Sequence, residues 1–292
     1  MEQLLLLRVG SLHYNFIASN FLNLSSCRME CIDGTILPWQ GTGLTDTGLI
    51  RTSNQDAFAV ENQLGIWVIA DGMGGHAGGS IASQLATESV LTHLRRSHSL
   101  LSSPSDQSGI AMKILEQAVA TGDSAIRDEV SKTPELEGMG TTLVIALLCQ
   151  RPPMQLAIAH VGDSRAYLIR KGTIQSLTTD HSFVQRLLTE GQITPEQAIN
   201  HPNQNVLLRA LGADNQSVPD INLHVLEPND IVMLCTDGLT KTVSDEDILA
   251  IVSRNNDSPS EACQQLIERA NSQGGKDNTT VVLISPSGSH LH

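Results

Sequence analysis

Residues 68–79 read "VIADGMGGHAGG", an apolar run that breaks into five glycines around Asp71 and His76. Glycine has no side chain to bury and loses much conformational entropy in a helix, so this density of glycine disfavours both a core and a helix. The apolar half is typical of a buried strand. We therefore expect a strand that ends at Asp71 and places its carboxylate where the surrounding backbone must carry no side chains.

Aspartates recur at the ends of other predicted strands. Asp163 closes "AIAHVGD" and Asp237 closes "IVMLCTD", whereas Asp277 and Asp56 stand just before, or at the start of, apolar runs. A single aspartate of this kind is most often a turn residue, but five at strand ends suggest that one end of the sheets gathers them. Their mutual repulsion would require a cation, and an all-oxygen ligand set favours Mg²⁺ or Mn²⁺ over Zn²⁺.

The composition is that of an ordinary globular chain, with 40% hydrophobic and 17% charged residues among 292. A net charge of −13 argues against a nucleic-acid binder, because such proteins need a basic face. The number of cysteines, five, is odd, and two of them, Cys149 and Cys235, lie in apolar runs, which favours buried, reduced thiols in a cytoplasmic protein. Cys27 and Cys31 lack a second ligand pair, so no zinc site is expected there.

Residues 1–40 form an N-terminal extension to which the sequence assigns no role. The extension is too polar for a membrane span or a typical signal peptide, although "LSSC" at 24–27 faintly resembles a lipoprotein cleavage site. Met29 is an alternative start of the chain. No linker divides the following residues, so we expect one domain over 41–286, a short tail over 287–292, and no membrane partner.

Short β-branched runs bounded by Gly, Asp or Pro predict strands, and apolar residues at helical spacing predict helices. The expected strands are 57–61, 65–70, 141–149, 155–161, 165–170, 230–236 and 279–285, and the expected helices are 79–96, 110–130, 244–253 and 258–272. The segments "ENQLG" and "RKGTI" are typical of hairpin turns, which favours antiparallel pairing. The Ser- and Pro-rich segment 97–108 predicts a surface loop. The order of elements indicates antiparallel sheets covered by helices.

Seven segments follow one another along the chain: "GLIRTSNQDAF", "VIADGMGGHAGG", "GMGTTLV", "AHVGDSRAYLIRKG", "LTTDHS", "LCTDGLT" and "GGKDNTTVVL". Together they resemble the successive motifs of the metal-dependent PP2C-type (PPM) Ser/Thr protein phosphatases in their bacterial form. A single DGxxG is weak, but seven ordered motifs over about residues 43–284 are specific. The resemblance implies a single α+β domain, in which a central antiparallel β-sandwich is flanked by helices on both faces.

The resemblance also implies roles for individual residues. Asp71 resembles the residue that bridges two core ions, Mn²⁺ or Mg²⁺, and the Gly72 carbonyl would ligate one of them. Arg51 matches the arginine that clamps the substrate phosphate, a task that suits a bidentate guanidinium group. The other expected ligands are Asp237 and Asp277 of the first ion, Asp56, which would hold metal-bound water, and Asp163 of a third, weaker site.

The histidines and one long loop are open to two interpretations. His76 is predicted either to act as a general acid on the leaving group or to bond a carboxylate, because eukaryotic relatives carry their histidine at the position of Met73. His160 is expected in the core, and His181 in a cap or a turn. Residues 178–212 resemble the mobile flap beside the active site of bacterial members, with a packing insertion as the alternative.

The resemblance implies hydrolysis of phosphoserine and phosphothreonine in proteins by water that two ions activate. The implied partners are phosphorylated proteins and a bacterial Ser/Thr kinase that the enzyme opposes, and a monomer is expected. One alternative is an inactive relative that serves as a phosphoprotein-binding or regulatory module, against which the retention of Asp71, Asp237, Asp277 and Arg51 argues. The other is a metal-dependent phosphatase of small molecules or phosphotyrosine.

Overall fold

The computed structural model describes residues 8–9, 12–13, 39–74, 77–102, 106–150, 153–199, 201–213 and 217–286. The chain separates into two compact units, Met1–Ile36 and Leu37–His292. In the first unit the described residues form a short antiparallel pair, β1 (Arg8–Val9) and β2 (Leu12–His13). The second unit contains all the aspartates that the sequence singles out.

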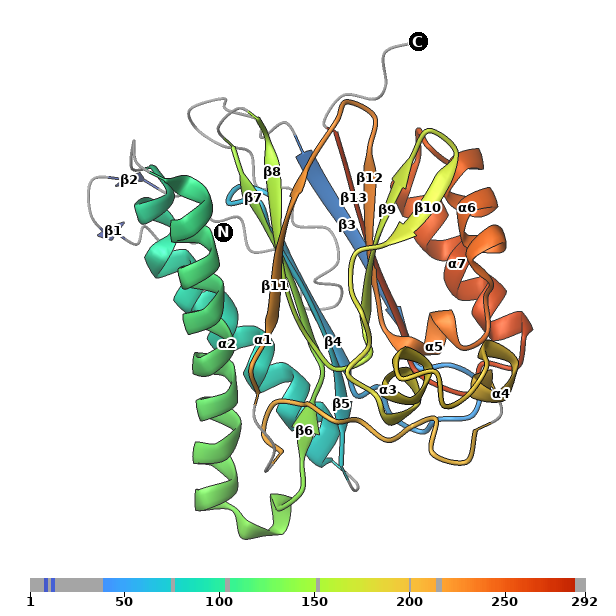
Figure 1. Ribbon diagram of the computed structural model, residues 1–292. Coiled ribbons are helices and arrows are strands. Elements are labelled where there is room, and N and C mark those ends of the chain that lie inside the picture. Colours follow the sequence, from blue (N-terminus) through green and yellow to red (C-terminus); the bar gives the residue numbers. More distant parts are fainter. Residues whose placement is uncertain are drawn as a thin grey trace, which may run out of the picture. The chain divides into compact units, whose positions relative to one another are not determined.

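Two antiparallel sheets form the centre of the second unit (Figure 1). One sheet has the strand order β11-β8-β7-β5-β4, and β6 pairs with the end of β5. Its strands are β4 (Asp56–Glu61), β5 (Ile66–Met73), β6 (Gly140–Thr141), β7 (Leu143–Cys149), β8 (Gln155–Val161) and β11 (Asp220–Val225). The other sheet has the order β10-β9-β12-β13-β3, with β3 (Trp39–Asp46), β9 (Arg165–Arg170), β10 (Thr173–Ser176), β12 (Ile231–Cys235) and β13 (Thr279–Pro286).

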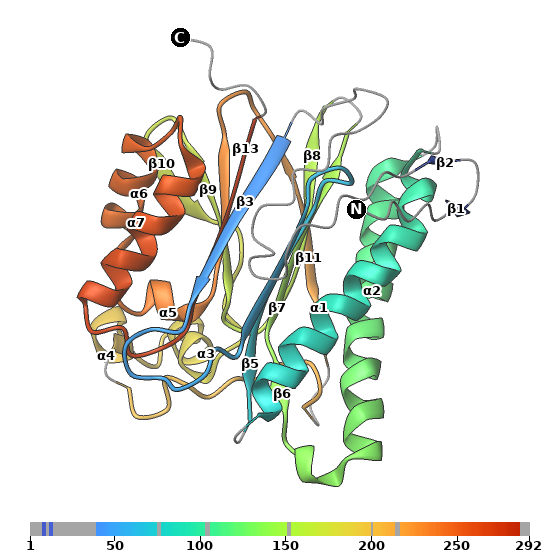
Figure 2. The ribbon, with the colours of Figure 1, turned by 180° about the vertical axis from the view of Figure 1, so that it is seen from behind.

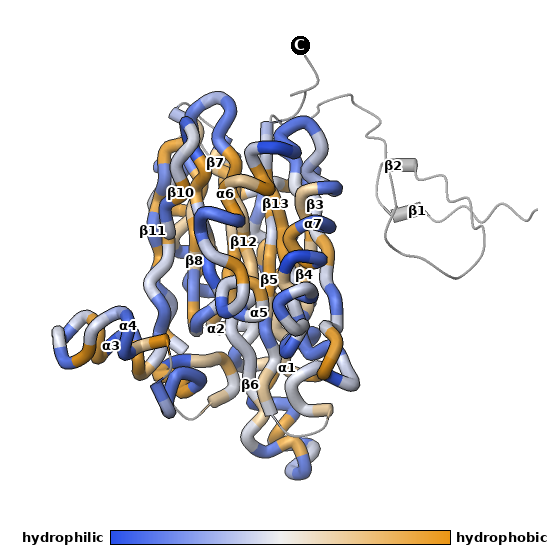
Figure 3. Tube along the Cα trace, turned by 90° about the vertical axis from the view of Figure 1, so that its right-hand side faces the viewer, coloured by the Kyte–Doolittle hydropathy of each residue, from blue (hydrophilic) through white to orange (hydrophobic). Residues whose placement is uncertain are grey.

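Strand β5 shows why the two sheets pack into a sandwich. Successive side chains of a strand point to opposite faces, and both faces of β5 are apolar. Trp67 and Ile69 lie in the core between the sheets, where Val282 of the second sheet also lies. Ile66 and Val68 lie in a separate core beneath helices. A strand covered on both faces therefore reads as a continuous apolar run, as Figure 3 shows in orange for the central strands of the sandwich.

Helices cover both outer faces of the sandwich (Figures 1 and 2). Helices α1 (Gly78–Ser97) and α2 (Gln107–Lys132) cover the β4–β5–β7–β8 face, and α6 (Asp245–Arg254) and α7 (Pro259–Ser272) cover the other sheet. The remaining helical segments are η1 (His98–Ser102), η2 (Pro134–Leu136), α3 (Phe183–Thr189), α4 (Pro195–Ile199) and α5 (Asp237–Thr240). No helix among the described residues combines the length and apolarity that a bilayer span needs.

The predicted α+β fold, an antiparallel sandwich with helices on both faces, is confirmed. The predicted strand 141–149 is interrupted, because Thr142 leaves the strand pattern and its Oγ1 accepts a hydrogen bond from Asp71 N at 2.9 Å. The expected loop 97–108 contains the short helix η1. Strand β3 was not expected because its sequence, "WQGTGLTD", carries glycines. A Cβ at Gly41 would lie 2.1 Å from Nε1 of Trp67, so the indole ring takes the place of a side chain.

Candidate metal centre

Asp56 and Asp71 stand directly opposite each other on the paired strands β4 and β5. The Asp56 carboxylate reaches the other sheet, where its Oδ2 accepts hydrogen bonds from Thr236 Oγ1 at 2.9 Å and Thr280 Oγ1 at 2.6 Å. Thr236 directly precedes Asp237, and Thr280 lies at the start of β13. One buried aspartate therefore joins the ends of strands from both sheets.

The other three aspartates stand at the same end of the sandwich. Asp163 follows the last residue of β8, Asp237 begins α5 just after β12, and Asp277 precedes β13. Antiparallel neighbours alternate in direction, so this end collects strands that finish there and strands that begin there. It is the lower end in Figure 1, where α5 lies. The structure thus brings together all five aspartates that the sequence singles out.

Burial and repulsion both disfavour ionisation of these carboxyl groups. The pKa of Asp56 is raised from 3.8 to about 7, chiefly by burial. The hydrogen bonds from the two threonines oppose this rise, and the charges of Asp237 and Asp277 add to it. Burial, followed by the charge of Asp237, likewise raises the pKa of Asp163 to about 7, although Lys241 opposes this. Burial and the charges of the other four aspartates hold the pKa of Asp71 well above its usual range. Keeping all of these carboxyl groups ionised therefore requires additional positive charge at the cluster.

Two observations test whether divalent ions fit here. Asp56 Oδ1 and Asp237 Oδ1 are buried and have no hydrogen-bond partner, so each carboxylate has an oxygen to offer. Among the described residues, no three Asp, Glu, His or Cys side chains group as they would around a single ion. The carboxylate oxygens therefore fit hard divalent ions, which complete their coordination with main-chain oxygen and water.

The backbone around Gly72 is packed too tightly for any side chain. A Cβ at Gly72 would lie 2.0 Å from the carbonyl oxygen of Gly79 and 2.6 Å from that of Gln55. Gly72 N also donates to the carbonyl oxygen of Gln55 at 3.1 Å. The glycines of residues 68–79 therefore allow the start of α1 to approach the strand that carries Asp71.

Two cations border the cluster. Nη2 of Arg51 lies 2.9 Å from Oδ1 and 3.0 Å from Oδ2 of Asp277, and about half of its side chain is exposed. Lys241 Nζ contacts Asp237 Oδ2 and donates to Asn205 Oδ1 at 2.8 Å. Sequence reasoning missed Lys241. The available signal was its position four residues after Asp237, at the C-terminal cap of α5, because residues at this spacing along a helix lie on one face.

Asn278 fixes the loop that holds Arg51. Its Nδ2 donates to the carbonyl oxygens of Thr47 at 2.9 Å and Ser53 at 3.1 Å, and its Oδ1 accepts from Gln55 N at 2.8 Å. Its main-chain N–H donates to Asp277 Oδ1 at 3.0 Å. One side chain therefore ties the loop before β4 to the turn that carries Asp277.

The histidines have different environments. His76 lies outside the described residues, so its role stays a prediction. His160 is buried and neutral, because burial lowers its pKa to about 3, and its ring lies 4.5 Å from that of His181. His181 packs a turn, with Nδ1 accepting from Gly162 N at 3.2 Å, whereas Ser182 caps α3 through its hydroxyl group. Of the two roles expected for His181, turn packing is therefore the correct one.

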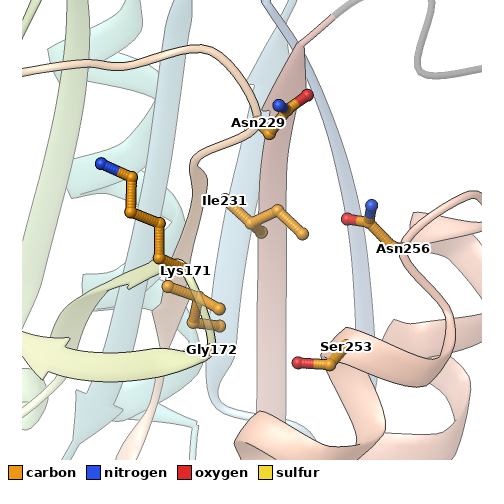
Figure 4. A pocket seen from close by; sticks show the side chains of 7 residues that line it. Lys171, Gly172, Asn229, Ile231, Ser253 and Asn256 are labelled. Atoms are coloured by element: carbon orange, nitrogen blue, oxygen red, sulfur yellow. The ribbon is translucent and has the colours of Figure 1, made fainter.

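A separate cavity of about 190 Å³ lies between the β9–β10 turn, the start of β12 and the end of α6 (Figure 4). Its lining includes Lys171, Asn229, Ser253 and Asn256, and Lys171 Nζ pairs with Glu227 Oε2 at 2.8 Å. The cavity lies at the opposite ends of β9 and β12 from the aspartates and is lined by no carboxylate. We therefore assign the chemistry to the aspartate cluster.

Comparison with known proteins agrees with this geometry. The family model described as protein phosphatase 2C matches residues 50–277, which include every one of the five aspartates. The chain belongs to the protein phosphatase 2C family. The family predicted from the sequence is confirmed.

Two curated relatives illustrate the match. The chain is 40% identical over 239 residues to the Ser/Thr protein phosphatase PstP of Mycobacterium tuberculosis, which covers 82% of this chain and 43% of PstP. It is 38% identical over 246 residues to the Ser/Thr phosphatase Stp of Listeria welshimeri, which covers 82% of this chain and 93% of Stp. The chain therefore spans less than half of PstP and nearly all of Stp. The names of both relatives agree with the predicted enzyme class.

A solved structure of this protein phosphatase 2C family extends the comparison to metal. The catalytic domain of PstP in complex with two manganese ions is 37% identical to this chain, with a TM-score of 0.72. The match covers 85% of this chain and 98% of that domain.

Proposed function

We propose that this protein hydrolyses phosphoserine and phosphothreonine in other proteins, with two Mn²⁺ or Mg²⁺ ions at the aspartate cluster. The convergence of five aspartates from both sheets, two of them with buried, unpartnered oxygens, carries the proposal. The two manganese ions of the PstP catalytic domain support it.

We assign the ion ligands as follows. Asp71 would be shared by the two ions, since it stands opposite Asp56 in the first sheet and experiences the charges of the aspartates in the second. Gly72 would contribute its carbonyl oxygen. The other residues that would hold ions are Asp237 and Asp277 for the first, Asp56 through water for the second, and Asp163 for a third, weaker one. When bound, the ions lower the pKa of water and withdraw charge from the phosphoryl oxygens.

The protein's own side chains orient these groups and the substrate. Thr236 and Thr280 hold Asp56 through Oδ2 and leave Oδ1 available. Arg51, held against Asp277, presents a guanidinium group that can take two phosphoryl oxygens at once. His76 remains a candidate for protonating the leaving hydroxyl group.

Arg51→Ala removes the phosphate clamp but no ion ligand. We expect KM for a phosphopeptide to rise about 10- to 100-fold, with a smaller fall in kcat and no loss of Mn²⁺ affinity, because hydrogen bonds to charged groups are worth about 1.5–3 kcal/mol. Steady-state kinetics and Mn²⁺ calorimetry provide the measurement. Arg96→Ala, at the exposed end of α1, is the control. If Arg51→Ala loses Mn²⁺ or unfolds, the arginine is structural.

The raised pKa values predict that stabilisation by Mn²⁺ depends on pH. Without ions the folded chain keeps protons on Asp56 and Asp163 up to about pH 7, whereas the unfolded chain releases them near pH 4. The stability that the two protonated groups contribute to the ion-free protein is thus lost as the pH rises from about 4 to about 7. Below pH 7 an ion that binds must also displace these protons, which weakens its binding. We expect Mn²⁺ to raise Tm more at pH 8 than at pH 6.

Measuring Tm with and without Mn²⁺ at each pH cancels the titration of the histidines, which is common to both samples. Asp56→Asn should reduce the pH dependence of the difference. An equal rise in Tm at pH 6 and pH 8 would show that the carboxyl groups are already ionised.

We also propose that the enzyme opposes a Ser/Thr kinase in bacterial signal transduction and acts as a cytoplasmic monomer. Three free cysteines, Cys149, Cys235 and Cys263, are buried, and burial raises the pKa of Cys149 to about 11, which supports a reducing compartment. Dephosphorylation of an autophosphorylated kinase from the same organism tests the pairing, and light scattering tests the monomer.

Phosphate release from a peptide panel tests the function itself. Protein freed of metal by EDTA is assayed with and without added Mn²⁺ on phosphoserine, phosphothreonine and phosphotyrosine peptides and on small phosphate esters. We expect Mn²⁺-dependent turnover that favours the first two. No turnover on any substrate would support the inactive regulatory module, and a preference for phosphotyrosine or small esters would support the other alternative.

A further inference from the structure

Exposed apolar side chains adjoin the aspartate cluster on two sides. Leu49 and Ile50 are 67% and 68% exposed and directly precede Arg51. Val206 is 45% exposed and follows Asn205, whose Oδ1 accepts from Lys241. Single exposed apolar side chains are common on protein surfaces. These three differ in their place, because they stand beside the two cations that contact the cluster, where a bound partner would meet them.

The backbone holds these side chains in place. Leu49 N and Ile50 N both donate to the carbonyl oxygen of Gly275, at 2.7 and 3.2 Å, and Asp277 follows two residues later. Gly275 has φ +51°, and a Cβ there would lie 2.7 Å from Leu49 Cγ. Leu49 and Ile50 are therefore fixed relative to the Arg51–Asp277 pair.

The flap side is anchored in a similar way. Phe183 N, at the start of α3, donates to the carbonyl oxygen of Val206 at 2.8 Å, and Val206 N donates to that of Asn203 at 3.1 Å. Val206 thus stands beside the Lys241–Asp237 contact, as Leu49 and Ile50 stand beside the Arg51–Asp277 contact.

We propose that Leu49, Ile50 and Val206 form an apolar rim that selects protein substrates with a large apolar residue close to the phosphorylated serine or threonine. This inference rests on the proposed function. A phosphate held by Arg51 places the flanking residues of the substrate next to the rim, because an extended chain advances only about 3.3–3.6 Å per residue. An apolar flank fits this rim better than an acidic one, since the chain carries a net charge of −13.

Two phosphothreonine peptides test the rim. They differ only at the two positions on each side of the phosphothreonine, which are leucine in one and serine in the other. For the wild type we expect KM for the leucine peptide to be about tenfold lower. In Leu49→Ser/Ile50→Ser that ratio should fall towards one, and Val206→Ser should reduce it in part.

Two controls keep the result interpretable. Leu100→Ser changes a leucine that is 57% exposed on η1, away from the strand ends, and should keep the wild-type ratio. Hydrolysis of p-nitrophenyl phosphate, which has no flanking residues, normalises for folded, metal-loaded enzyme. Ile50→Ser alone serves if the double variant does not fold.

The outcomes separate this proposal from the proposed function. Turnover of both peptides with equal KM by the wild type overturns the rim and leaves the phosphatase intact, whereas turnover of neither peptide contradicts the phosphatase. An unchanged ratio in the double variant also overturns the rim. If light scattering shows that the wild type dimerises and that the double variant is monomeric with an unchanged ratio, a second copy of the chain covers the rim instead.

Discussion

Asp71→Asn is expected to lower kcat/KM for a phosphopeptide by about 10⁴-fold or more. The substitution removes the charge that would bridge the two ions, and removing a group on which the activated water depends typically costs at least this much. The fold should survive, because the hydrogen bonds shown for Asp71 use its main chain. Its N–H donates to Thr142 Oγ1, and its carbonyl oxygen accepts from Thr141 Oγ1, each at 2.9 Å.

The same variant has a second readout that needs no activity. Burial of the carboxyl group and the charges of four other carboxylates raise the pKa of Asp71, so a neutral amide should relieve repulsion in the ion-free protein. We expect a Tm above that of the ion-free wild type and little further rise with Mn²⁺. Asp128→Asn, at an exposed position on α2, is the control. An active Asp71→Asn variant that still binds Mn²⁺ would remove the bridge from the account.

Asp163→Ala is expected to affect substrates unequally. A serine or threonine alkoxide leaves poorly without a proton, whereas p-nitrophenolate needs none, and proton transfer contributes about 10²–10⁴-fold. If Asp163 holds a third ion that assists the leaving group, kcat for a phosphopeptide should fall about 100-fold. The rate on p-nitrophenyl phosphate should change less than about fivefold, and two tightly bound ions should remain.

The structure favours a role for Asp163 in the aspartate cluster over a role as a turn residue alone. It is only 8% exposed, and its pKa responds to the charges of Asp237 and Lys241, which border the cluster. Equal losses on both substrates, or none on either, would leave Asp163 as a turn residue. Asp128→Ala, a change at an exposed position on the outer helix α2, controls for general loss of a carboxylate.

The sequence predicted the strands well where both faces of a strand are buried. Strands β5 and β7 lie between the second sheet and the helices, so their apolar runs are continuous and easy to recognise. Strand β11 was missed because its residues "DINLHV" are mostly half-buried or exposed at a sheet edge, where no such run is required. Strand β3 was missed because two large rings of the facing sheet, Trp67 of β5 and Phe58 of β4, fill the space above its glycines.

The candidate site was predictable because its aspartates share a feature that is local in sequence, a position at the end of a strand. The contacts that arrange them are not local. Thr236, Thr280 and Asn278 act across the sandwich, and their roles depend on a register that the sequence does not display. Lys241 shows both cases, since its position four residues after Asp237 is local, whereas its contact with Asn205 spans 36 positions.

The central claim is that the aspartate cluster works by holding two divalent ions. The most direct test titrates Mn²⁺ into EDTA-treated, dialysed full-length protein and measures bound Mn²⁺ per chain and phosphopeptide turnover in the same samples. The account predicts no turnover without bound Mn²⁺ and full turnover only when about two ions are bound to each chain. Turnover that persists in EDTA, or that reaches its maximum before a second ion binds, would contradict it.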